Sequence, residues 1–134
     1  MRLAGILITG GHPNKRSVEL FVPDTNLSCS LPPLSGPRHR HTQDGLLACG
    51  GFELTAKLSC ERLTRSGWRT EPYTLTAGRC YHASWDLNNG SLVLLGGYCS
   101  EATSERVDTS TGSAATFQLR GLVRFGCDSA AVQH

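Results

Sequence analysis

Leu46-Leu47-Ala48-Cys49-Gly50-Gly51 is an apolar run that ends in two glycines, and the pattern occurs three times along the chain. The other versions are Ile6-Leu7-Ile8-Thr9-Gly10-Gly11 and Leu92-Val93-Leu94-Leu95-Gly96-Gly97, so the first glycines are 40 and 46 residues apart. A short, nearly continuous apolar run is typical of a β-strand that is covered on both faces. The glycines let the backbone turn sharply where the strand ends, because glycine has no Cβ to restrict it.

A second motif advances in step with the glycine pairs. It is an arginine followed three residues later by histidine or cysteine, in Arg38-x-x-His41, Arg79-x-x-His82 and Arg124-x-x-Cys127. Two motifs with the same rhythm indicate an internal repeat of 40 to 46 residues. We expect the arginine to tie neighbouring units together, because a buried guanidinium can donate to several carbonyl groups.

Each repeat unit reads as four short strands. Eight residues after the second glycine stand Glu19, Ser59 and Glu105, in the strand that follows the apolar run. The fourth strand carries Cys29, Trp68 or Phe117. Turn sequences such as Asn89-Gly90 separate the strands. No segment has helical periodicity, so the sequence predicts an all-β protein.

These features together resemble kelch repeats. The resemblance lies in the double glycine, the glutamate-bearing strand that ends in Pro23-Asp24-Thr25 or Asp108-Thr109-Ser110-Thr111-Gly112, the aromatic Trp68, and the Arg-x-x-His opening. It covers nearly the whole chain and implies a β-propeller with four-stranded antiparallel blades. The chain departs from the kelch pattern at Cys29 and Phe117, which stand where tryptophan is usual.

The resemblance divides the chain into blades. Residues 1–37 make a blade that lacks its first strand, residues 38–78 and 79–120 make two more, and residues 121–134 are the first strand of a further, truncated blade. Closed propellers have about four to eight blades. We therefore expect an incomplete propeller that is a fragment of a larger one, with the remaining blades in the same parent chain. Assembly with other copies and a truncated gene model are the alternatives.

Six cysteines are many for a cytosolic domain of this size, and no C-x-x-C motif suggests a zinc site. Cys49 and Cys60 flank the turn between two strands and can face one another in an antiparallel pair, so they are the first predicted disulfide. The pairing of Cys80 with Cys99 is the second. Cys29 and Cys127 have no assigned partner.

Two N-glycosylation sequons begin at Asn26 and Asn89, each in a predicted turn. Together with the cysteines they favour an oxidising compartment. The absence of a signal-peptide pattern favours the opposite, unless the chain is a fragment. Localisation therefore stays open, with an extracellular or secretory site favoured for a fragment.

Composition excludes several classes of function. The formal net charge is only +2, which gives no electrostatic argument for nucleic acid. No apolar run approaches the roughly 20 residues of a membrane span. Nucleophile, P-loop and dinucleotide motifs do not occur, and we expect no catalytic residue, cofactor or metal.

Cys80-Tyr81-His82 suggests a copper site, but adjacent strand residues point to opposite faces. His39 and His41 could share a metal only with a third ligand.

The sequence thus favours a non-enzymatic module that binds or scaffolds an unidentified protein or glycan. The expected contact loops are residues 12–16, 53–57 and 100–103. One alternative is a fragment of a secreted propeller enzyme such as a copper-radical oxidase, with its catalytic residues in other blades. The other is a cytosolic kelch adaptor domain, which predicts free thiols.

Overall fold

The fold is a set of three antiparallel β-sheets, seen in a computed structural model that describes residues 4–13, 15–98 and 103–117. No described residue belongs to a helix, which confirms the all-β prediction. The first sheet has the strand order β1-β2-β3, formed by Ile6–Thr9, Val18–Val22 and Leu27–Leu31. The second has the order β4-β5-β6-β7, formed by Thr42–Asp44, Leu47–Cys49, Ser59–Thr64 and Gly67–Thr74. The third has the order β8-β9-β10-β11, formed by Ala83–Asp86, Ser91–Leu95, Ser104–Asp108 and Ala114–Phe117.

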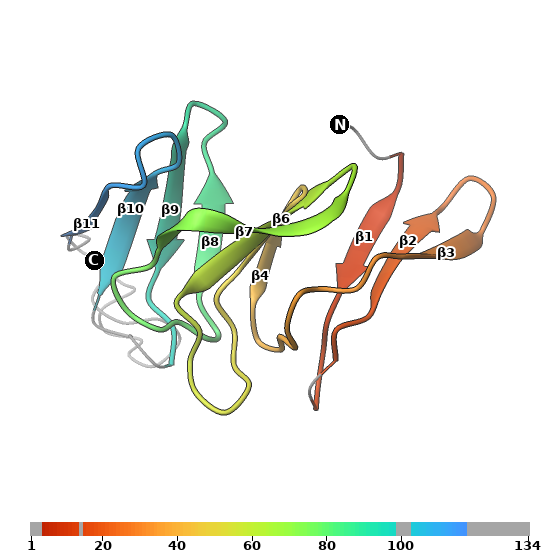
Figure 1. Ribbon diagram of the computed structural model, residues 1–134, viewed down its shortest axis with the longest axis horizontal. Coiled ribbons are helices and arrows are strands. Elements are labelled where there is room, and N and C mark those ends of the chain that lie inside the picture. Colours follow the sequence, from red (N-terminus) through yellow and green to blue (C-terminus); the bar gives the residue numbers. More distant parts are fainter. Residues whose placement is uncertain (1–3, 14, 99–102, 118–134) are drawn as a thin grey trace, which may run out of the picture.

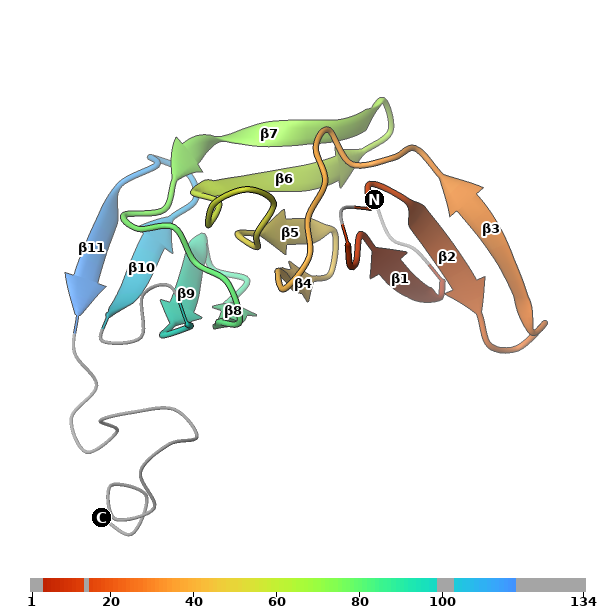
Figure 2. The same cartoon turned by 90° about the horizontal axis from the view of Figure 1, so that it is seen from below.

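The sheets follow one another in sequence and in space (Figure 1). Seen from below, they fan out as an arc, with β1, β4 and β8 along its inner side and β3, β7 and β11 along its outer side (Figure 2). The second and third sheets have four strands each, whereas β1 is the innermost described strand of the first sheet. Residues 121–134, the expected start of a further blade, lie outside the described residues.

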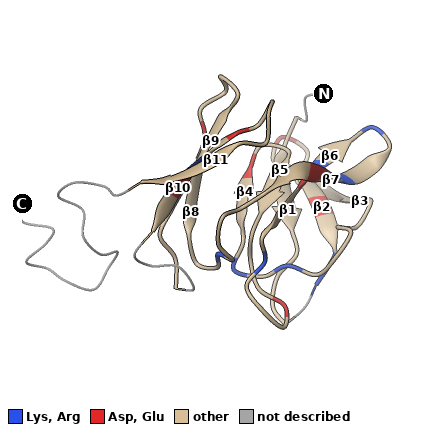
Figure 3. Ribbon diagram, turned by 60° about the vertical axis from the view of Figure 1, so that its left-hand side comes forward, with Lys and Arg blue, Asp and Glu red and all other residues tan. Residues whose placement is uncertain are grey.

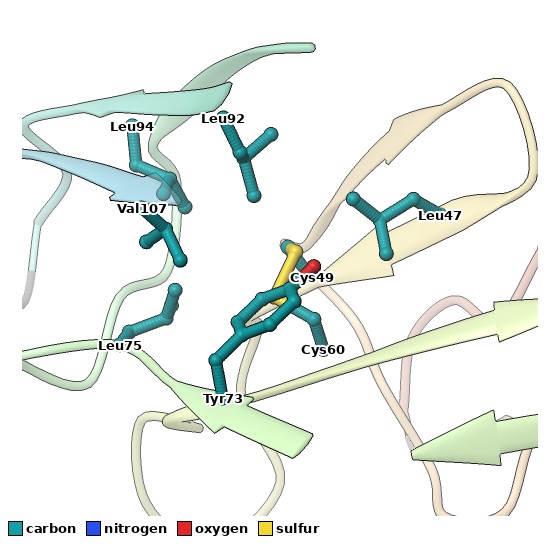
Figure 4. Close-up of a cluster of buried hydrophobic side chains, with 8 residues drawn as sticks. All are labelled: Leu47, Cys49, Cys60, Tyr73, Leu75, Leu92, Leu94 and Val107. Atoms are coloured by element: carbon teal, nitrogen blue, oxygen red, sulfur yellow. A yellow bond between two sulfur atoms is a disulfide. The ribbon is translucent and has the colours of Figure 1, made fainter. Parts of the chain in front are cut away.

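Two apolar clusters fill the spaces between neighbouring sheets. Between the first and second sheets lie Val18, Leu34 and Ala48, with Leu7, Leu31 and Trp68 packed against them. A larger cluster joins the second and third sheets, and its side chains converge from both (Figure 4): Leu47, Cys49, Cys60, Tyr73, Leu75, Leu92, Leu94 and Val107. Among the described residues, each sheet therefore buries a flat face against a neighbouring sheet. The middle sheet uses both of its faces.

The glycine pairs and the Arg-x-x-His motifs recur with the same spacing because they contact one another in the structure. Gly50 and Gly51 have φ angles of 65° and 99°, which L side chains rarely adopt. A Cβ at Gly50 would lie 2.7 Å from the carbonyl oxygen of Arg79 and 2.7 Å from a ring carbon of His82. Because these glycines have no Cβ, the segment that carries the next Arg-x-x-His motif can lie directly against the end of the preceding apolar strand.

The glutamate register differs from the sequence prediction in the second sheet. Glu19 lies opposite Ile8, and Glu105 lies opposite Leu94. Ile8 and Leu94 each stand two residues before a glycine pair. In the second sheet that position is held by Glu61, opposite Ala48. The prediction of Ser59 was wrong because the loop after Gly51 is two residues longer than its counterparts and contains its own bridge, between Phe52 and Ala56.

The residues expected to mark the fourth strand do not share one register. Cys29 lies in β3 opposite Leu20, Trp68 in β7 opposite Leu63, and Phe117 in β11 opposite Ser104. Relative to the glutamate of each sheet these are three different positions. Of the three, Trp68 packs across the interface between the first and second sheets, and its indole nitrogen donates to the carbonyl of Pro32 at 2.9 Å.

Replacing Gly50 with alanine should destabilise the protein more than the same change at Gly45. Both glycines have a positive φ, so both changes carry the backbone strain of about 1–2 kcal/mol. Only Gly50 faces nearby atoms, since nothing lies within 4 Å of a Cβ at Gly45. We expect the free energy of unfolding, measured in urea, to fall by about 3 kcal/mol or more for Gly50→Ala. Equal losses for the two variants would contradict the close contact.

Candidate binding surface

Each joint between sheets is built around a buried arginine. Arg38, in the linker before β4, is 2% exposed, and its Nε donates to a carboxylate oxygen of Glu61 at 2.9 Å. Its Nη1 donates to the carbonyls of Gly50 and Ser59, and its Nη2 to the hydroxyl of Ser59. The other oxygen of Glu61 accepts from the backbone N–H of Ser35. The guanidinium charge is therefore fully compensated inside the protein.

The second joint repeats these contacts with equivalent residues. Arg79 donates to Glu105 at 2.7 Å, to the carbonyls of Gly96 and Thr103, and to the hydroxyl of Thr103. Glu105 also accepts from the backbone N–H of Thr76. Each arginine carbonyl in turn accepts from the second glycine of the preceding sheet, Gly11 for Arg38 and Gly51 for Arg79. One residue thus contacts two sheets.

The histidines of the motifs lie in the same joints. Nε2 of His41 is 2.8 Å from the hydroxyl of Thr9, and Nε2 of His82 is 3.0 Å from that of Thr42. Nδ1 of each ring is buried and has no hydrogen-bond partner among the described residues. Burial, and next the charge of the neighbouring arginine, lowers the pKa of each histidine to about 4. Both rings are therefore neutral at pH 7.

The third residue of each motif is exposed at the surface of its joint. Arg40 and Tyr81 occupy this position, and both have left-handed backbones, with φ of 59° and 55°. The backbone N–H of Tyr81 donates to the carbonyl of Arg40, and the guanidinium carbon of Arg40 lies 4.7 Å from the centre of the Tyr81 ring. This distance allows a cation–π interaction. Tyr81 is 61% exposed.

Further rings extend this contact into one group, here called the Arg40 cluster: His12, His39, Arg40, Phe52 and Tyr81. Two of its members follow the apolar strands of the first and second sheets, and the other three lie in the linkers that lead into the second and third sheets. His12 and Phe52 directly follow glycine pairs, and Tyr98, which is 77% exposed, stands at the same position after the third pair. Charged residues are spread over the three sheets, and lysine and arginine mark several of the joint loops (Figure 3).

The expected contact loops are only partly represented in this surface. In residues 12–16, His12 belongs to the Arg40 cluster, and Asn14 lies outside the described residues. In residues 53–57, Glu53 and Lys57 form an ion pair at 3.1 Å. Residues 100–102 lie outside the described residues, and Thr103 belongs to the second joint. The signal that sequence reasoning missed is the ring-bearing residue after each glycine pair.

The predicted disulfide between Cys49 and Cys60 is confirmed, and it links directly opposed residues of β5 and β6. Cys80 is buried and disulfide-bonded, and its predicted partner Cys99 lies outside the described residues. Cys29 is an exposed free thiol, and Cys127 also lies outside the described residues.

Both predicted glycosylation sites are exposed. Asn26 stands in the turn between β2 and β3, with a φ of 54°. Asn89 stands in the turn between β8 and β9, where its side-chain oxygen accepts from the backbone N–H of Ser91. Both acceptor residues therefore lie at the surface and outside the paired strands.

The histidine and cysteine pairs that suggested metal chemistry have separate environments. Cys80 is disulfide-bonded, Tyr81 stacks on Arg40, and His82 is bonded to Thr42. His39 lies edge-on to His12 and Phe52, whereas His41 contacts Thr9 in the first joint. Within the described part of the chain, no group of three or more His, Cys, Asp or Glu residues is placed to hold a metal ion.

No protein-family model matches the chain, and no curated protein matches it significantly. No helix among the described residues is long and apolar enough to cross a membrane.

Glu61→Gln should destabilise the protein strongly, because it leaves the buried charge of Arg38 without a counter-charge. We expect the free energy of unfolding to fall by about 3–5 kcal/mol. Glu53→Gln is the matched control, since its ion pair with Lys57 is partly exposed and should contribute less than about 1 kcal/mol. Urea unfolding of both variants tests this, and similar losses for the two would argue against a structural role for the buried pair.

Acid should weaken the protein through His41 and His82. Because their folded pKa is about 4 and the usual value is 6.5, only the unfolded chain takes up protons between these limits. The free energy of unfolding should therefore be highest above pH 6.5 and fall towards pH 4, by on the order of 3 kcal/mol for each histidine. The groups that set this behaviour are Arg38, Glu61 and His39 around His41, and Arg79 and His41 around His82.

His82→Gln removes one of these titrations. The variant should lose less stability than the parent between pH 7.5 and pH 4.5, measured by urea unfolding at each pH. An unchanged pH dependence would show that His82 is not the group responsible.

Proposed function

We propose that this chain is a section of a kelch-type β-propeller and serves as a non-enzymatic module that binds a protein or a glycan. The arc of three sheets and the repetition of one joint support the propeller arrangement. In such an arrangement the loops at the ends of the strands form a common surface at one end of the wheel, which suits them to contact a partner.

The observation that carries the proposal is the backbone of Arg40 and Tyr81. A left-handed conformation costs a residue other than glycine about 1–2 kcal/mol, and glycine would occupy these positions without that cost. Both residues are exposed, so their side chains contribute little to the apolar core. Strain that is retained at exposed positions is a feature of functional sites.

The chemistry of the cluster suits recognition of a protein or a sugar. Tyrosine and arginine are enriched among the residues that contribute most to protein interfaces. An exposed ring also offers an apolar face to the C–H groups of a sugar, with the guanidinium beside it as a hydrogen-bond donor. The ring of Phe52 lies 5.9 Å from the guanidinium carbon of Arg40, and His39 contacts Phe52 edge-on; both rings are less exposed than Arg40.

The disulfide between Cys49 and Cys60 favours a protein of an oxidising compartment over a cytosolic adaptor. This is in line with an extracellular or secretory section of a larger propeller. A glycan or a cell-surface protein is the class of ligand that such a location would provide.

Glycine at both left-handed positions should separate binding from folding. The double variant Arg40→Gly/Tyr81→Gly should keep its free energy of unfolding within about 1 kcal/mol of the parent, because relief of strain offsets the lost stacking. Binding to ligands found on a glycan array, or in cross-linked capture from secreted proteins, should weaken at least tenfold. Leu27→Ser, a change of a 66% exposed residue on the outer strand β3, is the control and should bind normally. Retained binding in the glycine variant, or no ligand for the parent, would refute the proposal.

A further inference from the structure

The first sheet contains an arginine site whose arginine is not supplied by any described residue. Here called the Glu19 site, it consists of the Glu19 carboxylate, the Gly10 carbonyl, and the carbonyl and hydroxyl of Ser17. Glu19 occupies the register position of Glu61 and Glu105. Gly10 donates its N–H to the carbonyl of Ser17 at 2.8 Å, as Gly50 does to Ser59 and Gly96 to Thr103, each at 3.1 Å.

In the second and third sheets the same set of groups binds a guanidinium. The carboxylate, the glycine carbonyl, and the carbonyl and hydroxyl of serine or threonine all accept from Arg38 or Arg79. Glu61 and Glu105 are fully buried by this contact. Glu19 is exposed and makes no hydrogen bond or ion pair within the described part of the chain.

Beside the Glu19 site the first sheet exposes a position that is buried in the other two sheets. Ile8, opposite Glu19, is 49% exposed, whereas Ala48 and Leu94 at the same position are 0% exposed. Ile6, on the same face, is 55% exposed. In the other sheets a further inner strand, β4 or β8, pairs with the apolar strand, and the described residues place no such strand beside β1.

The opposite end of the arc shows the complementary face. Trp85 in β8 is 67% exposed and lies opposite Val93 on the face of the third sheet that points away from the second. In the second sheet the position of Val93 is held by Leu47, which is 1% exposed because the third sheet covers it. One end of the arc therefore exposes the face that receives a following sheet, and the other exposes the face that receives a preceding one.

The sequence contains an arginine suited to the Glu19 site. In each joint the arginine comes from the linker that follows one sheet, and it binds the glutamate of the next sheet. Arg124 follows the third sheet, and its motif Arg124-x-x-Cys127 repeats the spacing of Arg38-x-x-His41. After Arg38 and Arg79, the inner strand begins four residues later, which corresponds to Asp128. Residues 118–134 lie outside the described residues.

We propose that the Glu19 site binds Arg124 of a second copy of this chain, and that residues 128–131 of that copy pair with β1 as its missing inner strand. The register of the other sheets places residue 128 opposite Thr9 and residue 129 opposite Ile8. Reciprocal exchange between two copies is a closed two-fold arrangement. It joins two arcs of three sheets into a ring of six, within the range of about four to eight blades in closed propellers.

This assembly rests on the propeller arrangement proposed above but not on the Arg40 cluster or its ligand. The oligomeric state can therefore be measured without knowing what the protein binds. A dimer that binds no glycan or protein would leave the assembly standing, and a monomer that binds one would leave the ligand proposal standing.

Sedimentation velocity of the 134-residue chain tests the assembly. We expect a particle of twice the 14.4 kDa chain mass. Glu19→Arg and Arg124→Glu each place like charges at both joints and should raise the dissociation constant at least tenfold. Glu53→Arg, a change of a surface acid outside the interface, should leave it unchanged. Because Glu19 is exposed, the β-sheet circular dichroism of Glu19→Arg should match that of the parent.

Mixing the two charge variants in equal amounts gives the sharpest result. In the mixed dimer an acid meets a base at both joints, so it should form more tightly than either variant alone. A monomeric parent at all concentrations, a dimer indifferent to both charge changes, or a mixture no tighter than its components would overturn the proposal.

Discussion

The arginine–glutamate pair buried at each joint is the interaction on which the arrangement of the sheets depends. Arg79 and Glu105 are both fully buried, and burying a charge without a partner would cost several kcal/mol. The pair is stable only if the linker places the guanidinium within reach of the carboxylate and of the carbonyls at the strand ends. The glycine at each strand end, the short linker and the neutral histidine beside it all serve this placement.

Within one four-residue motif, some positions hold the joint and one position is exposed at the surface. The first and fourth residues point into the protein, where Arg38 and His41 hold the first joint and Arg79 and His82 the second. The third residue points out, and its identity changes from arginine to tyrosine. A repeat can therefore keep its architecture while the exposed position varies, which allows the surface to specialise without changes to the sheets.

The sequence contained enough to predict the sheets and one disulfide, because both follow local patterns. Apolar runs, glycine pairs and a turn between Cys49 and Cys60 depend on residues close together in the chain. The glutamate register was misjudged at Ser59, since counting along the sequence cannot show that the loop after Gly51 is longer. The Arg40 cluster was missed for a different reason: Arg40 and Tyr81 are neighbours only after two linkers fold against each other.

The disulfide of the middle sheet has a consequence for how the molecule loosens. Cys49 precedes Gly50, and Cys60 precedes Glu61, so the covalent bond joins the two strands whose next residues hold Arg38. The sulfur atoms themselves belong to the cluster on the opposite side, against the third sheet. One bond thus braces both interfaces of the central layer. Among the described residues each outer sheet packs against the central sheet alone, so reduction of this bond should loosen the one layer that both outer sheets contact.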